Sequence, residues 1–270
     1  MDDHHLAWFA LSELNLSFNQ SFQLAQAYGH GAKILEQQLG PQLKSIWSYK
    51  QQQRLAQLTS QPLKLSLAKQ LHWVTHNQVF LLCFDDENYP HALKSIAQPP
   101  AFLWGQGRLS LLNEPSIAMV GARKASPNGM ALAKHFAASL GASGLTIVSG
   151  LALGIDGEPH QGALDAQADT TAVLGSGLAH IYPTRHQPLT QAIIAAGLLV
   201  LPWSLTAQPL AYRFPARNQL ISGLSMGVIV VEAALGSGSL IIAKAALEQG
   251  AKSLLCPPVC TIFKPAAATS

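Results

Sequence analysis

Residues 116–150 read SIAMVGARKASPNGMALAKHFAASLGASGLTIVSG, and this stretch decides the fold. Two short apolar runs, 116–121 and 145–150, each end in glycine, and a segment of helical length, 126–144, lies between them. Apolar strands separated by helices are typical of a parallel sheet that is covered on both faces. The stretch therefore predicts a strand–helix–strand unit of an α/β domain.

The same alternation continues along the chain. Further strands are predicted at 170–177, 198–203, 226–233 and 251–256, with helices at 154–168, 187–197, 217–225 and 238–250. We therefore expect a Rossmann-like, doubly wound α/β fold with a mainly parallel sheet.

The first part of the chain has a different texture. Residues 4–75 are rich in Leu, Ala, Gln and Lys, with apolar residues three and four apart, which is typical of helices. We predict four parts: a helical domain at 1–80, a lead-in segment at 81–115, the Rossmann-like domain at 116–257 and an atypical tail at 258–270.

Composition limits the classes of protein to consider. The chain has 270 residues, of which 49% are hydrophobic and 11% charged, with a net charge of +3. It is long and apolar enough for a sizeable core, and the charge is too small to indicate nucleic-acid binding by itself. Four of the six arginines nevertheless fall at positions 123, 185, 213 and 217, which predicts a local positive site.

The cysteines and the N-terminus suggest a location. Cys83, Cys256 and Cys260 are too few and too irregularly spaced for a disulfide framework or a zinc cluster, so no metal or cofactor is expected. The acidic start MDDHH does not resemble a secretory signal. Residues 218–243 are long enough to span a membrane, but their Gly and Ser clusters favour a buried strand. We expect a cytoplasmic protein without membrane insertion.

Glycine turns follow four of the predicted strands, at Gly121, Gly150, Gly175 and Gly236. The carboxyl ends of parallel strands meet at one edge of a sheet, where ligands bind. Glycine allows close approach of the backbone, and amides at helix N-termini attract anions. The turns together predict a phosphate-binding surface, although no single turn matches a dinucleotide or P-loop fingerprint.

Three titratable residues near these turns are assigned structural roles. Asp156 stands where an N-cap belongs, so capping is favoured over acid–base chemistry. A lone histidine such as His160 more often packs than reacts. Glu232 is either a general acid or base or an acceptor for loop amides, and the absence of a placed second group favours the latter.

The motifs YPHALKSIAQPPAFLWGQG, VGARKASPNG, IVSGLALGID, AVLGSGLAHIYP, FPARNQLISGLS and VIVVEAALGSGSL resemble the DNA-processing protein A family (DprA, also called Smf). The resemblance covers about residues 85–257, and FPARNQLISGLS is its most specific element. The helical first domain stands where that family has a sterile-alpha-motif-like domain.

The resemblance implies a non-enzymatic, dimeric protein that binds and protects single-stranded DNA during natural transformation and helps load the RecA recombinase. It also implies which residues contact DNA: Arg123, Ser149, Gly150, Arg185, Arg217 and Asn218. Ser126 and Gly175, in two of the glycine turns, are further candidate DNA contacts. Structural support of the loops is assigned to Asp156, His160, Glu232, Gly236, Ser237 and Gly238.

The chemistry of the residues agrees with this function. Guanidinium groups hold phosphates, and Phe214 and Tyr182 are candidate stacking faces, with Phe214 equally a candidate core anchor. Arg217 is expected to contribute more than Arg213, which is expected to lie at the rim.

Departures from the family pattern leave two alternatives. Glu158, Pro159 and Ile242 differ from the family's usual residues, and the end PPVCTIFKPAAATS has the character of a truncated or frame-shifted tail. One alternative is a nucleoside-monophosphate hydrolase of the lysine-decarboxylase-like (LOG) type, although its P-G-G-x-G-T-x-x-E motif is missing. The other is an inactive truncated relative.

Overall fold

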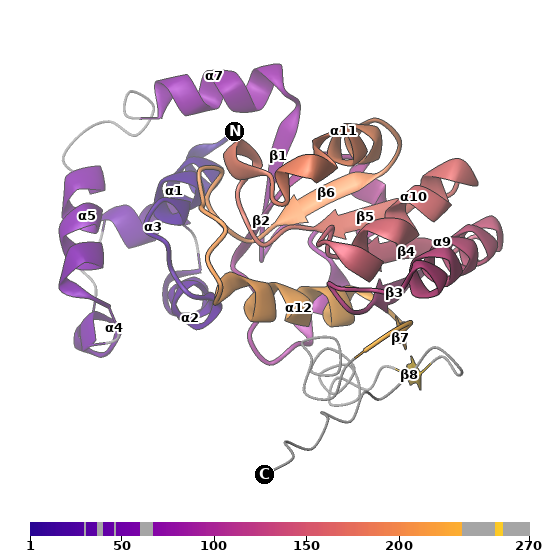
Figure 1. Ribbon diagram of the computed structural model, residues 1–270. Helices are drawn as coiled ribbons and strands as arrows, with labels where there is room; N and C mark the ends of the chain where they lie inside the picture. Colours follow the sequence, from indigo (N-terminus) through magenta and orange to yellow (C-terminus); the bar gives the residue numbers. More distant parts are fainter. Residues whose placement is uncertain (30, 37–39, 46, 60–66, 234–251, 256–270) are drawn as a thin grey trace, which may run out of the picture.

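A mostly parallel sheet organises the molecule (Figure 1). The computed structural model describes residues 1–29, 31–36, 40–45, 47–59, 67–233 and 252–255. Within these ranges the sheet has eight strands in the order β1-β2-β6-β5-β4-β3-β7-β8. The strands are β1 (Val79–Cys83), β2 (Phe102–Gly107), β3 (Ser116–Val120), β4 (Thr146–Ser149), β5 (Thr170–Val173), β6 (Leu198–Leu201), β7 (Gly227–Val230) and β8 (Lys252–Leu255). All pairs from β6 to β8 are parallel, which confirms the predicted Rossmann-like fold.

The segment predicted as a lead-in belongs to the same sheet. Strand β2 pairs antiparallel with β6, with Gly107 opposite Leu198, and β1 pairs antiparallel with β2, with Cys83 opposite Phe102. A short helix, α8 (His91–Lys94), connects the two strands. Residues 79–107 therefore extend the sheet by two strands instead of only leading into it, while the domain boundaries themselves stay predictions.

Helices cover both faces of the sheet (Figure 1). One face carries α9 (Pro127–Ala142), α10 (Glu158–Asp165) and α11 (Gln187–Ala196), and the other carries α12 (Arg213–Leu224). Alternate residues of β3 serve the two layers, since Met119 packs with Ala133 whereas Val120 shares a core with Leu220. This alternation follows from the two-residue period of a strand.

Helix α12 begins at Arg213, one turn earlier than the predicted start at residue 217. Pro215 falls in the first turn, where a backbone amide has no partner within the helix, so proline is tolerated there. The earlier start places Arg213, Phe214 and Arg217 on one helix.

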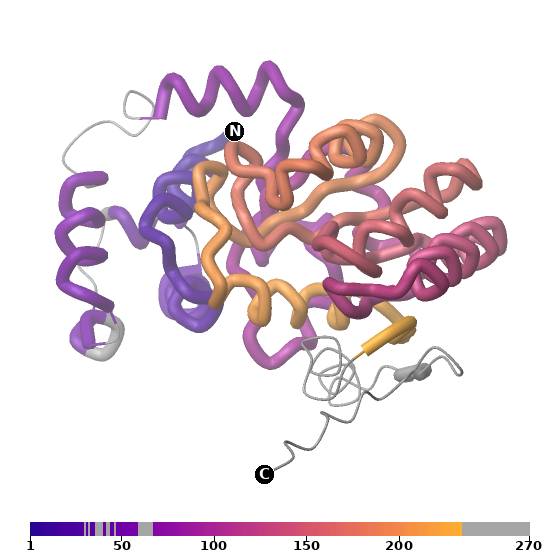
Figure 2. Tube along the Cα trace, in the orientation of Figure 1, coloured from indigo at the N-terminus to yellow at the C-terminus, as the bar shows by residue number. Residues whose placement is uncertain are grey.

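The helical N-terminal part packs against the antiparallel edge of the sheet. Its helices are α1 (Asp3–Ser12), α2 (Phe18–Tyr28), α3 (Gly31–Glu36), α4 (Pro41–Ser45), α5 (Tyr49–Thr59) and α7 (Ala68–His76). Figure 2 shows this indigo and purple segment gathered on one side of the sheet. Phe9 meets Trp104 edge to face at 4.7 Å between ring centroids, and Trp8 lies 6.0 Å from Phe102. One hydrophobic core therefore joins the two parts.

No helix within the described ranges has both the length and the apolar character needed to cross a membrane. Part of the weakly charged stretch 218–243, the helix predicted at 238–250 and the tail at 258–270 lie outside these ranges.

Helices α9 and α10 touch through a glycine. A Cβ added to Gly162 would lie 2.1 Å from the carbonyl oxygen of Lys134, a backbone atom that cannot turn aside. Only glycine therefore fits at this crossing.

We expect the substitution Gly162→Ala to lower the free energy of unfolding by about 2 kcal/mol, because overpacking forces the two helices apart. Urea denaturation measures the change. The control Gly40→Ala points a methyl group into open space and should stay within about 0.5 kcal/mol of the parent protein. Equal stability of the two variants would contradict the close crossing.

Candidate functional site

Three of the four predicted glycine turns come together at the carboxyl edge of the parallel strands. Gly121 follows β3, Gly150 follows β4, and Gly175 lies just beyond β5. Each glycine leaves room for a neighbouring side chain. An added Cβ would lie 2.5 Å from Ile155 at Gly121, 1.5 Å from Arg217 at Gly150 and 3.0 Å from Phe214 at Gly175. The fourth turn, with Gly236, Ser237 and Gly238, lies outside the described residues.

Arg217 is a buried cation beneath this edge. Only 2% of the residue is exposed, and its Nη1 donates a hydrogen bond to the carbonyl oxygen of Val173 at 3.0 Å. Burial lowers the pKa of Arg217 to about 10, and the nearby Asp156 carboxyl partly offsets this effect. The guanidinium keeps its charge at neutral pH, but it reaches the surface only slightly.

Asp156 does not cap a helix, which corrects the sequence interpretation. It lies in the 3-10 helix η2 (Gly154–Gly157), and α10 begins at Glu158 without a side-chain cap. Its Oδ1 instead accepts the amide of Gly121 at 3.2 Å. Burial raises the pKa of Asp156, while Arg217 and the Gly121 amide act in the opposite direction. Asp156 therefore accepts a backbone amide that is distant in sequence, not an amide of the helix that follows it.

Glu232 secures the loop between β3 and α9. Its Oε2 accepts the backbone amide of Ser126 at 3.1 Å and the Ser126 hydroxyl at 2.8 Å. Its carbonyl oxygen accepts the amide of Ala122 at 2.7 Å, and Ser126 in turn caps α9 through the amide of Gly129 at 3.0 Å. The carboxylate is thus engaged with loop donors, the role that the sequence analysis favoured over acid–base chemistry.

Arg123, Phe214 and Tyr182 form a row across the edge. The guanidinium carbon of Arg123 lies 5.4 Å from the centroid of the Phe214 ring, and that ring lies 6.0 Å from Tyr182 at an interplanar angle of 66°. Arg123 is exposed, Tyr182 is 48% exposed and Phe214 is half-buried over Gly175. We call these three residues the cation–aromatic row. It offers one charge and two ring faces to a ligand.

The predicted contact residue Ser149 and the predicted loop-support residue His160 both point into the protein. Ser149 is fully buried, and its hydroxyl donates to the carbonyl oxygen of Met119 at 2.6 Å, so this side chain ties β4 to β3 and does not face a ligand. His160 is also fully buried, with Nδ1 2.7 Å from the hydroxyl of Thr170. That hydroxyl donates to Ile147, so Nδ1 carries the proton. Burial lowers the pKa of His160 to about 3, with His186 and Arg217 acting in the same direction.

Arg213, on α12, does not lie at the rim of the site, so this prediction from the sequence was also wrong. It is 3% exposed and donates to the carbonyl oxygen of Gln208 at 2.6 Å and to Oδ1 of Asn15 at 2.9 Å. Its guanidinium carbon lies 5.2 Å from the Trp203 ring. Arg213 therefore links α12 to the helical N-terminal part.

The remaining predicted residues lie at the surface or close to it. Arg185 is exposed in the 3-10 helix η4 (Thr184–His186), and Asn218 is half-buried on α12, one turn after Phe214. The sequence reasoning missed Lys124, which is exposed next to Arg123 in the same loop. Its position directly after Arg123 in the turn GARKAS was the signal in the sequence that could have identified it.

The fold and this edge define a Rossmann-like protein whose candidate ligand surface combines cations with aromatic rings. A model of the family described as DNA recombination-mediator protein A matches residues 80–267, more than half of the chain. The chain belongs to this family.

Characterised relatives agree with this membership. Protein Smf of Escherichia coli is 43% identical over 193 residues, which cover 71% of this chain and 52% of that protein. DNA processing protein DprA of Bacillus subtilis is 40% identical over 63% of this chain and 58% of its own length. The chain spans about half the length of the curated relatives it matches.

Solved structures share the fold. DNA processing protein A of Streptococcus pneumoniae matches with a TM-score of 0.78 and 30% identity, over 95% of this chain and 87% of that one. A structure of DNA processing protein A from Helicobacter pylori, described as revealing its single-stranded DNA binding mode, matches with a TM-score of 0.62 and 32% identity, over 68% and 82% of the two chains.

The buried His160 should make stability depend on pH. Its pKa is about 3 in the folded protein and 6.5 in the unfolded chain, so below pH 6.5 only the unfolded chain takes up the proton. The free energy of unfolding should therefore fall by about 1.4 kcal/mol for each pH unit below 6.5, or about 2 kcal/mol at pH 5. Urea denaturation of the parent and of His160→Gln at pH 7 and pH 5 measures this loss, which the variant should lack. The exposed His135→Gln is the control and should behave as the parent; the same pH dependence in all three proteins would contradict the assignment.

Proposed function

We propose that this protein binds single-stranded DNA at the carboxyl edge of its sheet. The observation that carries the proposal is the cation–aromatic row of Arg123, Phe214 and Tyr182 across the glycine turns. Binding of single strands combines charges that follow the phosphates with rings on which bases stack. The row offers both kinds of contact on one partly exposed surface.

The surrounding cations extend this surface. Lys124 is exposed next to Arg123, and Arg185 is exposed three residues after Tyr182. Contacts of these kinds read the backbone and the ring faces, not base identity. The protein should therefore tolerate many sequences, and its affinity should fall as salt rises.

The relatives support this ligand. The H. pylori structure, 32% identical to this chain, concerns the binding of single-stranded DNA. The family description names recombination mediators. We infer from these that this protein protects single strands during natural transformation and helps load the RecA recombinase, acting in the cytoplasm as a homodimer.

We further infer that the protein binds DNA without cleaving it. Asp156 and Glu232 each accept loop donors, and His160 is fully buried against Thr170. Among the described residues near the edge, Asp156, His160 and Glu232 thus serve the structure, and none of them forms an acid–base pair of the kind that a nucleoside-monophosphate hydrolase needs.

Fluorescence anisotropy with labelled single- and double-stranded oligonucleotides at two salt concentrations tests the proposal. We expect a preference for single strands, and for Arg123→Ala a dissociation constant roughly tenfold higher with a salt slope smaller by about 0.7. Phe214→Leu should lose about 1 to 3 kcal/mol of binding free energy from stacking.

The matched control is Arg108→Ala, which removes the same charge at the opposite edge of the sheet, where Arg108 pairs with Asp169. It should bind as tightly as the parent. Equal affinity for single and double strands, or no loss on Arg123→Ala, would overturn the assigned site. No binding by the parent would favour an inactive relative, and release of free base from a nucleoside monophosphate would favour the hydrolase.

A further inference from the structure

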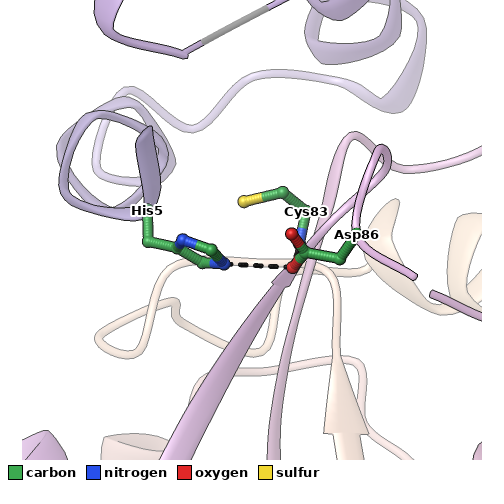
Figure 3. Close-up of side chains that lie close together, drawn as sticks. All are labelled: His5, Cys83 and Asp86. Atoms are coloured by element: carbon green, nitrogen blue, oxygen red, sulfur yellow. Dashed lines mark hydrogen bonds and ion pairs between the residues drawn. The ribbon is translucent and has the colours of Figure 1, made fainter. Parts of the chain in front are cut away.

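Two short polar motifs face each other where helix α1 meets the end of β1. One is Asp-Asp-His-His at residues 2–5, and the other is Cys-Phe-Asp-Asp at 83–86. Figure 3 shows His5 reaching from α1 toward Cys83 and Asp86, which lie at the end of β1 and in the turn after it. The amide of Asp86 donates to the carbonyl oxygen of Cys83 at 2.9 Å, so residues 83–86 form a tight turn. This turn places the side chains of Cys83 and Asp86 close together.

The three side chains offer one nitrogen, one sulfur and one oxygen ligand. The His5 ring nitrogen, the Cys83 sulfur and a carboxylate oxygen of Asp86 all lie within 4.8 Å of one another. Nε2 of His5 lies 3.0 Å from Oδ2 of Asp86. Two such ligands on a tetrahedral zinc ion stand about 3.4 Å apart, given metal–ligand distances near 2.1 Å. A small opening of this contact would admit the ion.

Groups next to these ligands form hydrogen bonds with them and can hold them in position for a metal ion. A metal-bound histidine usually donates its second ring N–H to a carboxylate, which fixes the ring. Nδ1 of His5 lies 2.7 Å from Oδ1 of Asp2, and the amide of Cys83 donates to Oδ2 of Asp86 at 2.7 Å. Both a histidine and a carboxylate ligand are thus oriented before any ion arrives.

The burial and the charges of the three side chains also suit a divalent cation. Cys83 is fully buried, whereas the side chains of His5 and Asp86 are 23% and 22% exposed, which leaves a way in from solvent. A thiolate and a carboxylate would balance the two charges of a divalent ion. A fourth position remains for water or for Asp85, which belongs to an adjoining group with His4 and Asp86.

We propose that Nε2 of His5, the thiolate of Cys83 and the carboxylate of Asp86 bind a zinc-type divalent cation that fastens α1 to the first strand of the sheet. On binding, the Cys83 thiol loses its proton to solvent, as does Nε2 of His5, and both atoms become ligands through their lone pairs. The ion would join two segments that are 81 residues apart in sequence.

Cobalt(II) provides the test, because it takes the place of zinc and reports a bound thiolate by a charge-transfer band in the near ultraviolet. The freshly reduced parent protein should show this band at one equivalent of cobalt, together with the visible bands of a tetrahedral ion. Zinc should abolish the bands and raise the midpoint of thermal unfolding. Cys83→Ser should lack the charge-transfer band.

Two further variants protect the test against simple misfolding. His5→Gln changes a partly exposed side chain and should weaken cobalt binding at least tenfold while retaining the circular dichroism of the parent. Asp2→Asn keeps a residue that caps α1 well but loses the outer carboxylate, and should weaken binding about 10- to 100-fold.

Matched controls address the other potential ligands. The double variant His72→Gln, His76→Gln removes a pair of stacked histidines on α7, and the double variant Cys256→Ser, Cys260→Ser removes the other thiols. Both should retain the band. Absence of the band in the parent, or a band that survives Cys83→Ser, would overturn the proposal, and neither result bears on DNA binding.

Discussion

The guanidinium of Arg217 occupies the space that a side chain at residue 150 would need, since a Cβ on Gly150 would lie 1.5 Å from Nη1. The same nitrogen donates to the carbonyl oxygen of Val173. Helix α12 is thereby tied to the ends of β4 and β5 through one side chain. A buried cation is costly unless charge and hydrogen bonds compensate it, and Asp156 supplies the opposing charge. Because Asp156 also accepts the amide of Gly121, the loop after β3 depends on the same pair.

A second set of contacts holds that loop from its other end. Glu232 receives donors from Ala122 and Ser126, the residues on either side of Arg123 and Lys124. The amide of Ile155 also reaches the carbonyl oxygen of Ala122 at 3.1 Å. The backbone is therefore fixed on both sides while the cationic side chains remain at the surface. A loop ordered in advance loses less entropy when a ligand binds, which favours affinity without additional contacts.

Local patterns in the sequence were sufficient for the parallel part of the sheet. The strands at 116–121 and 145–150 were found because glycine marks their ends and apolar residues fill them. The pairing of β1 and β2 with β6 depends on tertiary contacts, so the same segment could be recognised only as a lead-in. The helix-capping interpretation of Asp156 and the rim position of Arg213 were wrong for a related reason, although Asp156 does support a loop. The amide of Gly121 is 35 residues from Asp156 and Asn15 is 198 residues from Arg213, beyond the reach of any local rule.

The arginines near the edge differ in how their charge acts. Arg123 is exposed, so in the proposed DNA complex a phosphate that pairs with it would release counterions, and this release would give binding its salt dependence. Arg217 is enclosed by β4, β5 and α12, where its field is screened much less by salt. Asp156 balances part of this charge, and the guanidinium holds the glycine turns in place. Replacing Arg217 would therefore change both the charge and the shape of the edge, whereas replacing Arg123 removes a surface contact from an intact loop. For this reason Arg123, although it lies outside the FPARNQLISGLS motif, isolates the electrostatic part of binding.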